Sequence, residues 1–346
     1  MKKIAILLLL IPSLLISAKA TDLKIPQAPS GVYEYMPQEN ESFAQGVLYI
    51  AATAIKKLAP ELAEGIKIGM LLLAATLAMS VIGSLNGTAK KMSDLIGVMY
   101  SSIVLLNSAH SMIRLGIDTI TEMAGYGKLL LPVMTAALAA SGGAGTSAAL
   151  YGGTAIFSAL LTSIIQKAFI PLLYIFIALC VANRVIGEDV LNSLKQFLKW
   201  LMTWTLKLVL YVFTGFITIT GVVSGSADAM SLKAAKITIS GMIPVVGGII
   251  SDASEAILVG AGVMKSAAGI YGTFAFLAIC IGPILKITLH CVLLRITAAL
   301  CSVVGSKAQT GIVEDFSQCM NLILAATGSV CLLLLISTVV FMKGAN

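Results

Sequence analysis

Long runs of uncharged, mostly apolar residues alternate with short charged segments along most of the chain. The clearest runs are Ile68–Ala89, Leu95–Ile113, Leu208–Ala227 and Phe316–Met342, which are 19 to 27 residues long. A helix needs about 20 consecutive apolar residues to cross the hydrocarbon core of a bilayer. Each of these runs therefore predicts one membrane-spanning helix, with a boundary where the charged residues resume.

A longer uncharged run, Leu129–Gln166, contains helix breakers. Pro132 lies near its start, and Gly142, Gly143 and Gly145 divide it. Proline removes an amide donor and clashes with the preceding turn, whereas glycine gives the backbone extra freedom. We expect a short helix, a flexible break and a second helix here, and a re-entrant pair is one arrangement that fits.

The segment Ile237–Ser251 is also uncharged, but it has only 15 residues and contains Pro244, Gly247 and Gly248. It is too short and too interrupted to be an ordinary spanning helix. Irregular backbone exposed to lipid would leave N–H and C=O groups without partners. We therefore expect the segments around Pro132 and Pro244 to pack centrally, where protein or an aqueous path shelters them.

The segment Glu188–Trp204 differs from the others because it is amphipathic, with leucines on one side and polar residues on the other. This pattern is typical of a helix that lies along the membrane surface, with Trp200 and Trp204 at headgroup depth. The alternative is a helix that packs against the soluble domain of a partner protein.

Two groups of ionisable residues occur at helical spacing. Arg114 and Asp118 share one helical face, which is either a solvated or interfacial face or a pair at a pore mouth. Lys286, His290 and Arg295 follow an apolar run and are the only ionisable group that looks buried. Charges inside a membrane are costly enough to suggest a function. The alternative for this second group is a cationic patch at the membrane interface.

Residues 1–20 have the pattern of a secretory signal, with a basic start, a short apolar core and small residues before the cleavage point. The alternative is an uncleaved first anchor. Cleavage would leave residues 21–65 outside the cytoplasm, as a Pro- and Glu-containing arm that orders on contact with other protein. Residues 66–346 then form a multi-pass transmembrane domain.

The composition supports the same class. Hydrophobic residues make up 58% of the 346 residues and charged residues only 11%, against roughly 25% charged in soluble domains. The mean hydropathy is +0.98. We therefore expect an all-α, polytopic membrane protein with six to eight crossings. The net charge of +7 is not gathered into a nucleic-acid footprint; it is better suited to setting membrane orientation and meeting anionic lipid headgroups.

The residues of common catalytic and metal sites are not grouped in this sequence. His110 and His290 each stand alone in apolar surroundings, and the six cysteines form no closely spaced pair. No phosphate-binding loop or nucleophile elbow is present. The sequence thus predicts no enzyme, no metal and no cofactor.

A faint internal repeat is another feature of the hydrophobic pattern. Pro132 and Pro244 are 112 residues apart, and so are Pro171 and Pro283, which interrupt two further apolar runs. The repeat halves would be about 86–197 and 198–309. Either the match is a coincidence or the chain contains a duplication. Halves with an odd number of crossings would be inverted relative to each other, as in many transporters.

The order of short segments between residues 233 and 265 resembles a known family. Lys233-Ala-Ala-Lys236, Ile243-Pro-Val-Val-Gly247, Ser251-Asp-Ala253 and Gly260–Lys265 are similar to stage III sporulation protein AE. The resemblance implies a permease-like or channel-forming component of the complex between mother cell and forespore, required for endospore formation. It also implies a place in the mother-cell membrane around the forespore. The implied partners are the other membrane and ring-forming proteins of the operon and a forespore-membrane protein.

Two alternatives from other functional classes remain open at this point. A stand-alone secondary transporter predicts substrate flux by this protein alone, with loss on changing Pro244, Gly247 or Gly248. A non-conducting scaffold for ring-forming partners predicts that such changes are tolerated, whereas surface changes in Glu188–Lys199 abolish assembly. The sequence also leaves room for a homo-oligomer.

Overall fold

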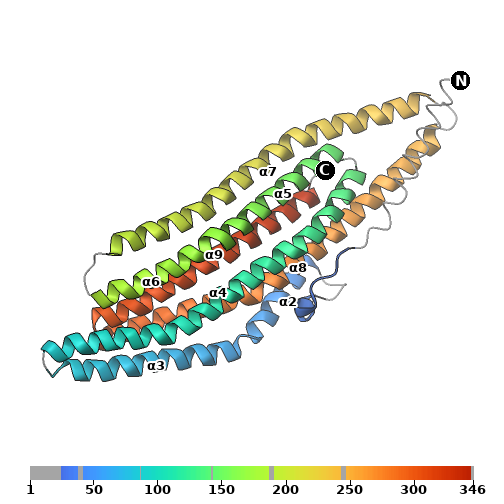
Figure 1. Ribbon diagram of the computed structural model, residues 1–346. Helices are drawn as coiled ribbons and strands as arrows, with labels where there is room; N and C mark the ends of the chain where they lie inside the picture. The colour runs from blue at the N-terminus through green and yellow to red at the C-terminus, as the bar shows by residue number, and fades with distance from the viewer. Residues whose placement is uncertain are drawn as a thin grey trace.

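The computed structural model describes residues 25–37, 42–85, 87–141, 143–186, 191–242 and 247–343, and within 221–266 only the backbone. The described chain forms an elongated bundle of roughly parallel and antiparallel helices, without strands (Figure 1). The elements are η2 (Ser30–Tyr35), α2 (Phe43–Lys56), α3 (Ala59–Gly83), α4 (Gly87–Ala140), α5 (Ala144–Ile164), η3 (Ile165–Phe169), α6 (Ile170–Ile186), α7 (Asn192–Met242), α8 (Gly247–Val304) and α9 (Lys307–Lys343).

Six helical segments of the described chain are long and apolar enough to cross a membrane. They are α3, α4, the continuous α5–η3–α6 segment, the first part of α7, the second part of α8, and α9. This confirms the predicted all-α polytopic class and its six to eight crossings. The predicted signal, residues 1–20, lies outside the described residues.

The long helices extend well beyond the crossings that the charge pattern predicts. With 54 residues, α4 is about 80 Å long, against about 30 Å for the hydrocarbon core. Beyond the predicted crossing Leu95–Ile113, α4 continues as a helix through Arg114 and Asp118 to Ala140. A charged residue changes the solvation of a helix without breaking its hydrogen bonds, so it does not end the helix.

Proline likewise does not end the helices in which it was expected to. Pro132 lies inside α4 and Pro283 inside α8, so the predicted breaks at these residues are wrong. An interior proline costs about 3 kcal/mol because one hydrogen bond is lost. Within a bundle, neighbouring helices and local adjustments offset that cost. At Pro171 the adjustment is visible, since the π-helical turn η3 ends two residues before it.

The glycine-containing break between α4 and α5 is confirmed. The described helices end at Ala140 and resume at Ala144. Gly143, at the N-cap of α5, donates its N–H to Leu138 O at 3.1 Å. The re-entrant pair is wrong, however, because α5 continues through η3 into α6 as one 43-residue helical segment. No breaker between residues 144 and 186 is strong enough to turn the chain back.

The amphipathic segment before residue 204 is not a separate surface helix. From Asn192 onward it forms the start of α7 and packs against α9 and α6. Its buried side, which includes Leu198 and Met202, faces the bundle, while Trp200 and Trp204 are exposed. The prediction of a surface-lying helix is therefore wrong, because Leu198 packs into the bundle, although Leu194 and Phe197 of the same apolar side stay exposed.

The bundle is organised around α9, which packs against α8, α4, α6, α7 and α5. In its most apolar stretch 56% of the residues are buried, whereas the value for the peripheral α3 is 17%. The arm also packs on the bundle: the Ala28 N–H donates to the Tyr271 hydroxyl at 3.2 Å, and Phe43 stacks on Phe274. This agrees with an arm that orders on contact.

The proposed repeat halves each contain two of the long helical segments, α4 with α5–α6 and α7 with α8. An even number would give the halves the same orientation, so the condition for inverted halves is not met. The duplication itself stays a prediction.

Candidate functional site

A cavity of about 680 Å³ lies between α3, α4 and α8, and we call it the polar chamber. It contains two of the three residues that the sequence groups together, Lys286 and His290, which lie one turn apart on α8. The polar side chains that line it are Glu61, Glu64, Lys67, Asn107, Ser108, Ser111, Lys286 and His290. The chamber therefore has a charged and polar lining between helices of bilayer-crossing length.

The carboxylate that pairs with Lys286 comes from the first turn of α3. The Lys286 ammonium donates to Glu61 Oε1 at 2.6 Å, and both side chains are partly buried. Sequence reasoning missed this partner because 225 residues separate the two. The signal that was available is the position of Glu61 and Glu64 just before the first uncharged run.

His290 is 4% exposed, and its Nδ1 has no hydrogen-bond partner in the described chain. A buried polar atom without a partner costs about 1–3 kcal/mol. Such an atom at a cavity wall is suited to a water molecule or a bound solute. Whether His290 belongs to a functional internal site or to a cationic patch at the membrane interface stays a prediction.

Arg295 does not belong to the chamber. It is exposed on α8 and does not line the cavity. Five residues along a helix correspond to a rotation of about 140°, so Arg295 lies away from the face of His290. The prediction that Arg295 groups with Lys286 and His290 is therefore wrong.

Arg114 and Asp118 form an ion pair on the outside of α4. The distance from Arg114 Nε to Asp118 Oδ2 is 3.9 Å, and the side chains are 77% and 70% exposed. Neither lines the polar chamber. The exposure fits a solvated or interfacial face, and the pore-mouth pair stays a prediction.

Among the candidate hinge residues with described surroundings, Pro132, Gly143 and Gly145 do not line the chamber. Pro132 is exposed within α4, and Gly145 lies in the first turn of α5. Gly247 and Gly248 begin α8, whose side chains are not described at that point. Gly142 and Pro244 lie outside the described residues. The predicted central packing of the segment around Pro244 therefore stays a prediction.

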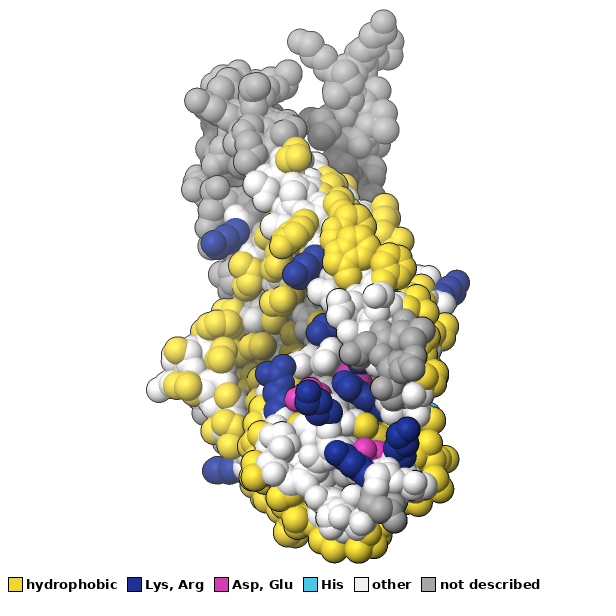
Figure 2. All heavy atoms as spheres, turned by 90° about the vertical axis from the view of Figure 1, so that its left-hand side faces the viewer, with side chains coloured by type: hydrophobic (Ala, Val, Ile, Leu, Met, Phe, Trp, Pro, Cys, Tyr) yellow, Lys and Arg dark blue, Asp and Glu magenta, His cyan; other side chains and the backbone are white. Residues whose placement is uncertain are grey.

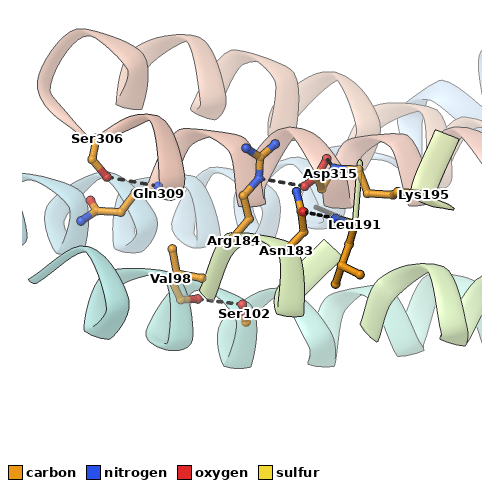
Figure 3. Close-up of polar contacts among 9 residues, drawn as sticks. All are labelled: Val98, Ser102, Asn183, Arg184, Leu191, Lys195, Ser306, Gln309 and Asp315. Carbon is orange, nitrogen blue, oxygen red and sulfur yellow. Dashed lines mark hydrogen bonds and ion pairs between the residues drawn. The ribbon is translucent and has the colours of Figure 1, made fainter. Parts of the chain in front are cut away.

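A second group of charges, which the sequence analysis missed, is buried nearer the α8–α9 turn. Asp315 of α9 is 1% exposed and accepts from two cations: Arg184 Nε at 3.0 Å and Lys195 Nζ at 2.7 Å. Figure 3 shows the two cations reaching this carboxylate from opposite sides, from the end of α6 and the start of α7. The cluster thus joins three helices at one point.

Local sequence features position this ion cluster. Gly311 lies one turn before Asp315, and a Cβ there would overlap the guanidinium of Arg184. Glycine therefore lets the arginine cross α9 closely. Asn183 Oδ1 accepts from the N–H of Leu191 at 3.1 Å and holds the end of α6 against the start of α7 (Figure 3).

A signal for this cluster was present in the amphipathic pattern. Lys195 is three residues before Leu198 and four after Leu191, so it lies on the leucine side of the helix and not on the polar side. A lysine on the apolar face predicts a buried acidic partner, because a buried ammonium without one is costly.

The comparisons with known proteins agree with the resemblance seen in the sequence. The family model described as stage III sporulation protein AE matches residues 32–345. This chain belongs to the stage III sporulation protein AE family. A curated member, stage III sporulation protein AE of Bacillus subtilis (strain 168), is 26% identical over 265 residues, which are 75% of this chain. The match covers 65% of the length of that relative. No solved structure matches the chain significantly.

The family is one of sporulation proteins, and the six spanning segments indicate a membrane protein. The family match covers α3 to α9, and so includes both the polar chamber and the ion cluster.

Proposed function

We propose that this protein is the permease-like or channel-forming membrane component of the complex that connects mother cell and forespore during endospore formation. The polar chamber carries the proposal. Ionisable groups are expensive inside membrane segments and are retained where they bind or pass a solute. A lining with both carboxylates and ammonium groups, beside the unpartnered His290 Nδ1, suits a small polar solute.

The distribution of charge supports an orientation for this component. The α3–α4 and α8–α9 turns lie at the same end of the bundle (Figure 1), and Lys90, Lys91 and Lys307 are beside them. Cytoplasmic loops carry an excess of lysine and arginine, so this end would face the mother-cell cytoplasm. With six crossings, the arm and the C-terminus would then both lie on the extracytoplasmic side.

The partners follow from the family likeness. The proposed partners are the other membrane and ring-forming proteins of the same sporulation operon and a protein of the forespore membrane, and further copies of this chain are compatible with the fold. We propose a location in the mother-cell membrane around the forespore. We propose no catalytic role.

Thiol accessibility tests the conduit. Ser108→Cys and Ser111→Cys place thiols in the chamber, whereas Ile103→Cys places one on the exposed outer surface of the same helix. In membrane vesicles, a membrane-impermeant maleimide should label the first two positions, because water fills a conduit. Ile103→Cys is the matched control, and lipid should protect it.

The native cysteines do not interfere with this assay, because all six are buried. Equal protection of all three engineered thiols would contradict a water-accessible chamber. Labelling of Ile103→Cys as well would show that the outer surface is not in lipid.

The scaffold alternative is favoured by one specific observation. Phe197, Trp200 and Trp204 stack in series on α7, with ring centroids 6.0 and 5.9 Å apart, and all three are exposed. Such a strip suits either the membrane interface or a partner helix. If Trp200→Ala with Trp204→Ala abolishes co-purification of the operon partners while chamber variants do not, the scaffold is the better proposal. A stand-alone transporter would instead show flux in vesicles that contain only this protein.

A further inference from the structure

A second cavity, of about 980 Å³, lies at the lysine-rich end of the bundle, and we call it the end cavity. The α3–α4 turn, the end of α6 and the α8–α9 turn form its walls. Figure 2 views the molecule from this end and shows Lys and Arg side chains gathered around a few acidic ones, with hydrophobic side chains at the margin. Neither the proposed conduit nor the ion cluster explains this cavity.

The lining of the end cavity is strongly positive. Lys90, Lys91, Arg184 and Lys307 contribute four cations, and Asp94 is the one carboxylate among the lining residues. Arg184 already pairs with the buried acid of the ion cluster. The three lysine side chains, in contrast, form no ion pair or hydrogen bond within the described part of the chain.

The lysines also lie where the helices disfavour them. Both α4 and α9 begin at this cavity, and neither has an acidic residue in its first turn. Lys90 is in the first turn of α4, and Lys307 is the first residue of α9. A helix N-terminus carries a partial positive charge and favours an anion, so cations there are unfavourable. An anion bound between the two N-termini would relieve both conflicts.

A buried amide supplies an independent indication of a ligand. Gln309 is 2% exposed and lines the cavity. Its Nε2 donates to Ser93 O at 3.4 Å and to Asp94 Oδ1 at 3.3 Å, and this fixes which way the amide points (Figure 3 shows the side chain). Its Oε1 has no hydrogen-bond partner in the described chain. A hydroxyl group that reached it from the cavity would supply the missing donor.

The lining also has an apolar part, beside several serines, and this part continues onto the outer surface. Met79, Leu95, Val185, Ile186 and Val304 line the cavity, and several of these side chains are exposed. Apolar walls beside a cluster of lysines are suited to a molecule with an anionic head and an attached acyl chain. A free anion would gain nothing from these walls.

We propose that the end cavity binds a phosphate ester with neighbouring hydroxyl groups, with the phosphate between the three lysines and the two helix N-termini and a hydroxyl donated to Gln309 Oε1. Two sources supply this chemistry: the headgroup of an anionic glycerophospholipid, such as phosphatidylglycerol, and a soluble glycerol phosphate. The apolar walls favour the lipid.

Binding to the full-length protein in detergent micelles tests the proposal, with native mass spectrometry to count bound molecules. The probes are phosphatidylglycerol, phosphatidylcholine, glycerol 1-phosphate, and phosphatidylmethanol, which has the same charge as phosphatidylglycerol but no free hydroxyl. We expect phosphatidylglycerol to bind at least about tenfold more tightly than phosphatidylcholine, because charge-assisted hydrogen bonds are the strong ones. It should also bind more tightly than phosphatidylmethanol.

Two triple variants with the same loss of charge distinguish a site from general basicity. Replacement of Lys90, Lys91 and Lys307 by Gln should weaken phosphatidylglycerol binding by about tenfold or more. The control is Gln at Lys56, Lys207 and Lys343, which are exposed elsewhere, and it should bind as the wild type does. Circular dichroism confirms that both variants fold, and Arg at the three cavity positions should restore binding.

Each outcome decides a part of the proposal. Equal binding by the two Gln variants would overturn it, since the lysines would then act only as orientation signals. Equal affinities for phosphatidylglycerol and phosphatidylmethanol would overturn the role of Gln309. Tighter binding of glycerol 1-phosphate than of phosphatidylglycerol, lost in the cavity variant, would support the phosphate site and assign it to a soluble ligand.

Discussion

Replacement of Asp315 by Asn should destabilise the protein strongly, because it removes the one anion between two buried or half-buried cations. The Lys195 side chain is 7% exposed, and its ammonium lies 2.7 Å from Asp315 Oδ1. At an effective dielectric constant of about 20, two unit charges at this separation attract by roughly 6 kcal/mol. Desolvation of each ion costs several kcal/mol, so the intact cluster contributes little net stability.

The balance changes when only the anion is removed. Lys195 keeps its desolvation cost and loses its partner, and this situation costs about 3–5 kcal/mol. The free energy of unfolding of Asp315→Asn, measured by denaturant titration in detergent micelles with far-UV circular dichroism, should fall by that amount. The matched control is Asp118→Asn, which removes the exposed partner of Arg114 and should change stability by less than about 1 kcal/mol.

A second variant separates an unpaired charge from a simple loss of packing. Combining Lys195→Met with Asp315→Asn removes the buried ammonium as well, so the double variant should be more stable than Asp315→Asn alone by about 1–3 kcal/mol. The reasoning would be refuted if Asp315→Asn were no less stable than Asp118→Asn. A double variant less stable than both single variants would show that packing, and not charge, dominates.

Three further predictions concern other contacts. Lys286→Met should lower the free energy of unfolding by about 1–2 kcal/mol, because Glu61 keeps part of its burial without a counter-ion, and adding Glu61→Gln should recover part of the loss. Gly311→Ala should lower the free energy of unfolding by about 1–3 kcal/mol, because the new methyl group displaces the guanidinium of Arg184. Gly328→Ala is the control: it has open space around it, and its thermal unfolding should show no loss of stability. On the arm, the hydrogen bond and charge of Lys57 lower the pKa of Glu34. Their contact is therefore present above the ordinary glutamate pKa of about 4.3 and lost as the pH falls through the lowered value. The protection of residues 25–37 against hydrogen exchange, taken relative to the intrinsic rate at each pH, should therefore fall in acid, and Glu34→Gln should abolish that fall.

The charge pattern was a good guide to the number of crossings and a poor guide to where helices end. Hydrophobicity is a local property of about 20 residues, so six spanning segments can be read from the runs. A helix end depends on whether the backbone hydrogen bonds continue. In α4 they continue through Arg114 and Asp118 and past Pro132, because the neighbouring helices stabilise the whole length.

The candidate site was partly accessible from sequence. Lys286 and His290 could be grouped because they are one turn apart on one helix, and the structure places both at the polar chamber. Arg295 was grouped with them by sequence distance alone, and helical rotation separates it. The acid that completes the chamber, Glu61, comes from another helix and could not be paired with Lys286 from local spacing.

The sequence by itself determined the class of this protein, its spanning segments, its glycine break before α5 and its family. All of these depend on local composition or on extended similarity. Only the tertiary structure decided which charges meet. Arg184 and Lys195 reach Asp315 across 131 and 120 residues, and Lys90 and Lys307 share a cavity although they lie at opposite ends of the transmembrane domain in the sequence. The physical reason is that the energy of a charge depends on its surroundings, and a helical bundle builds those surroundings from segments that are distant along the chain.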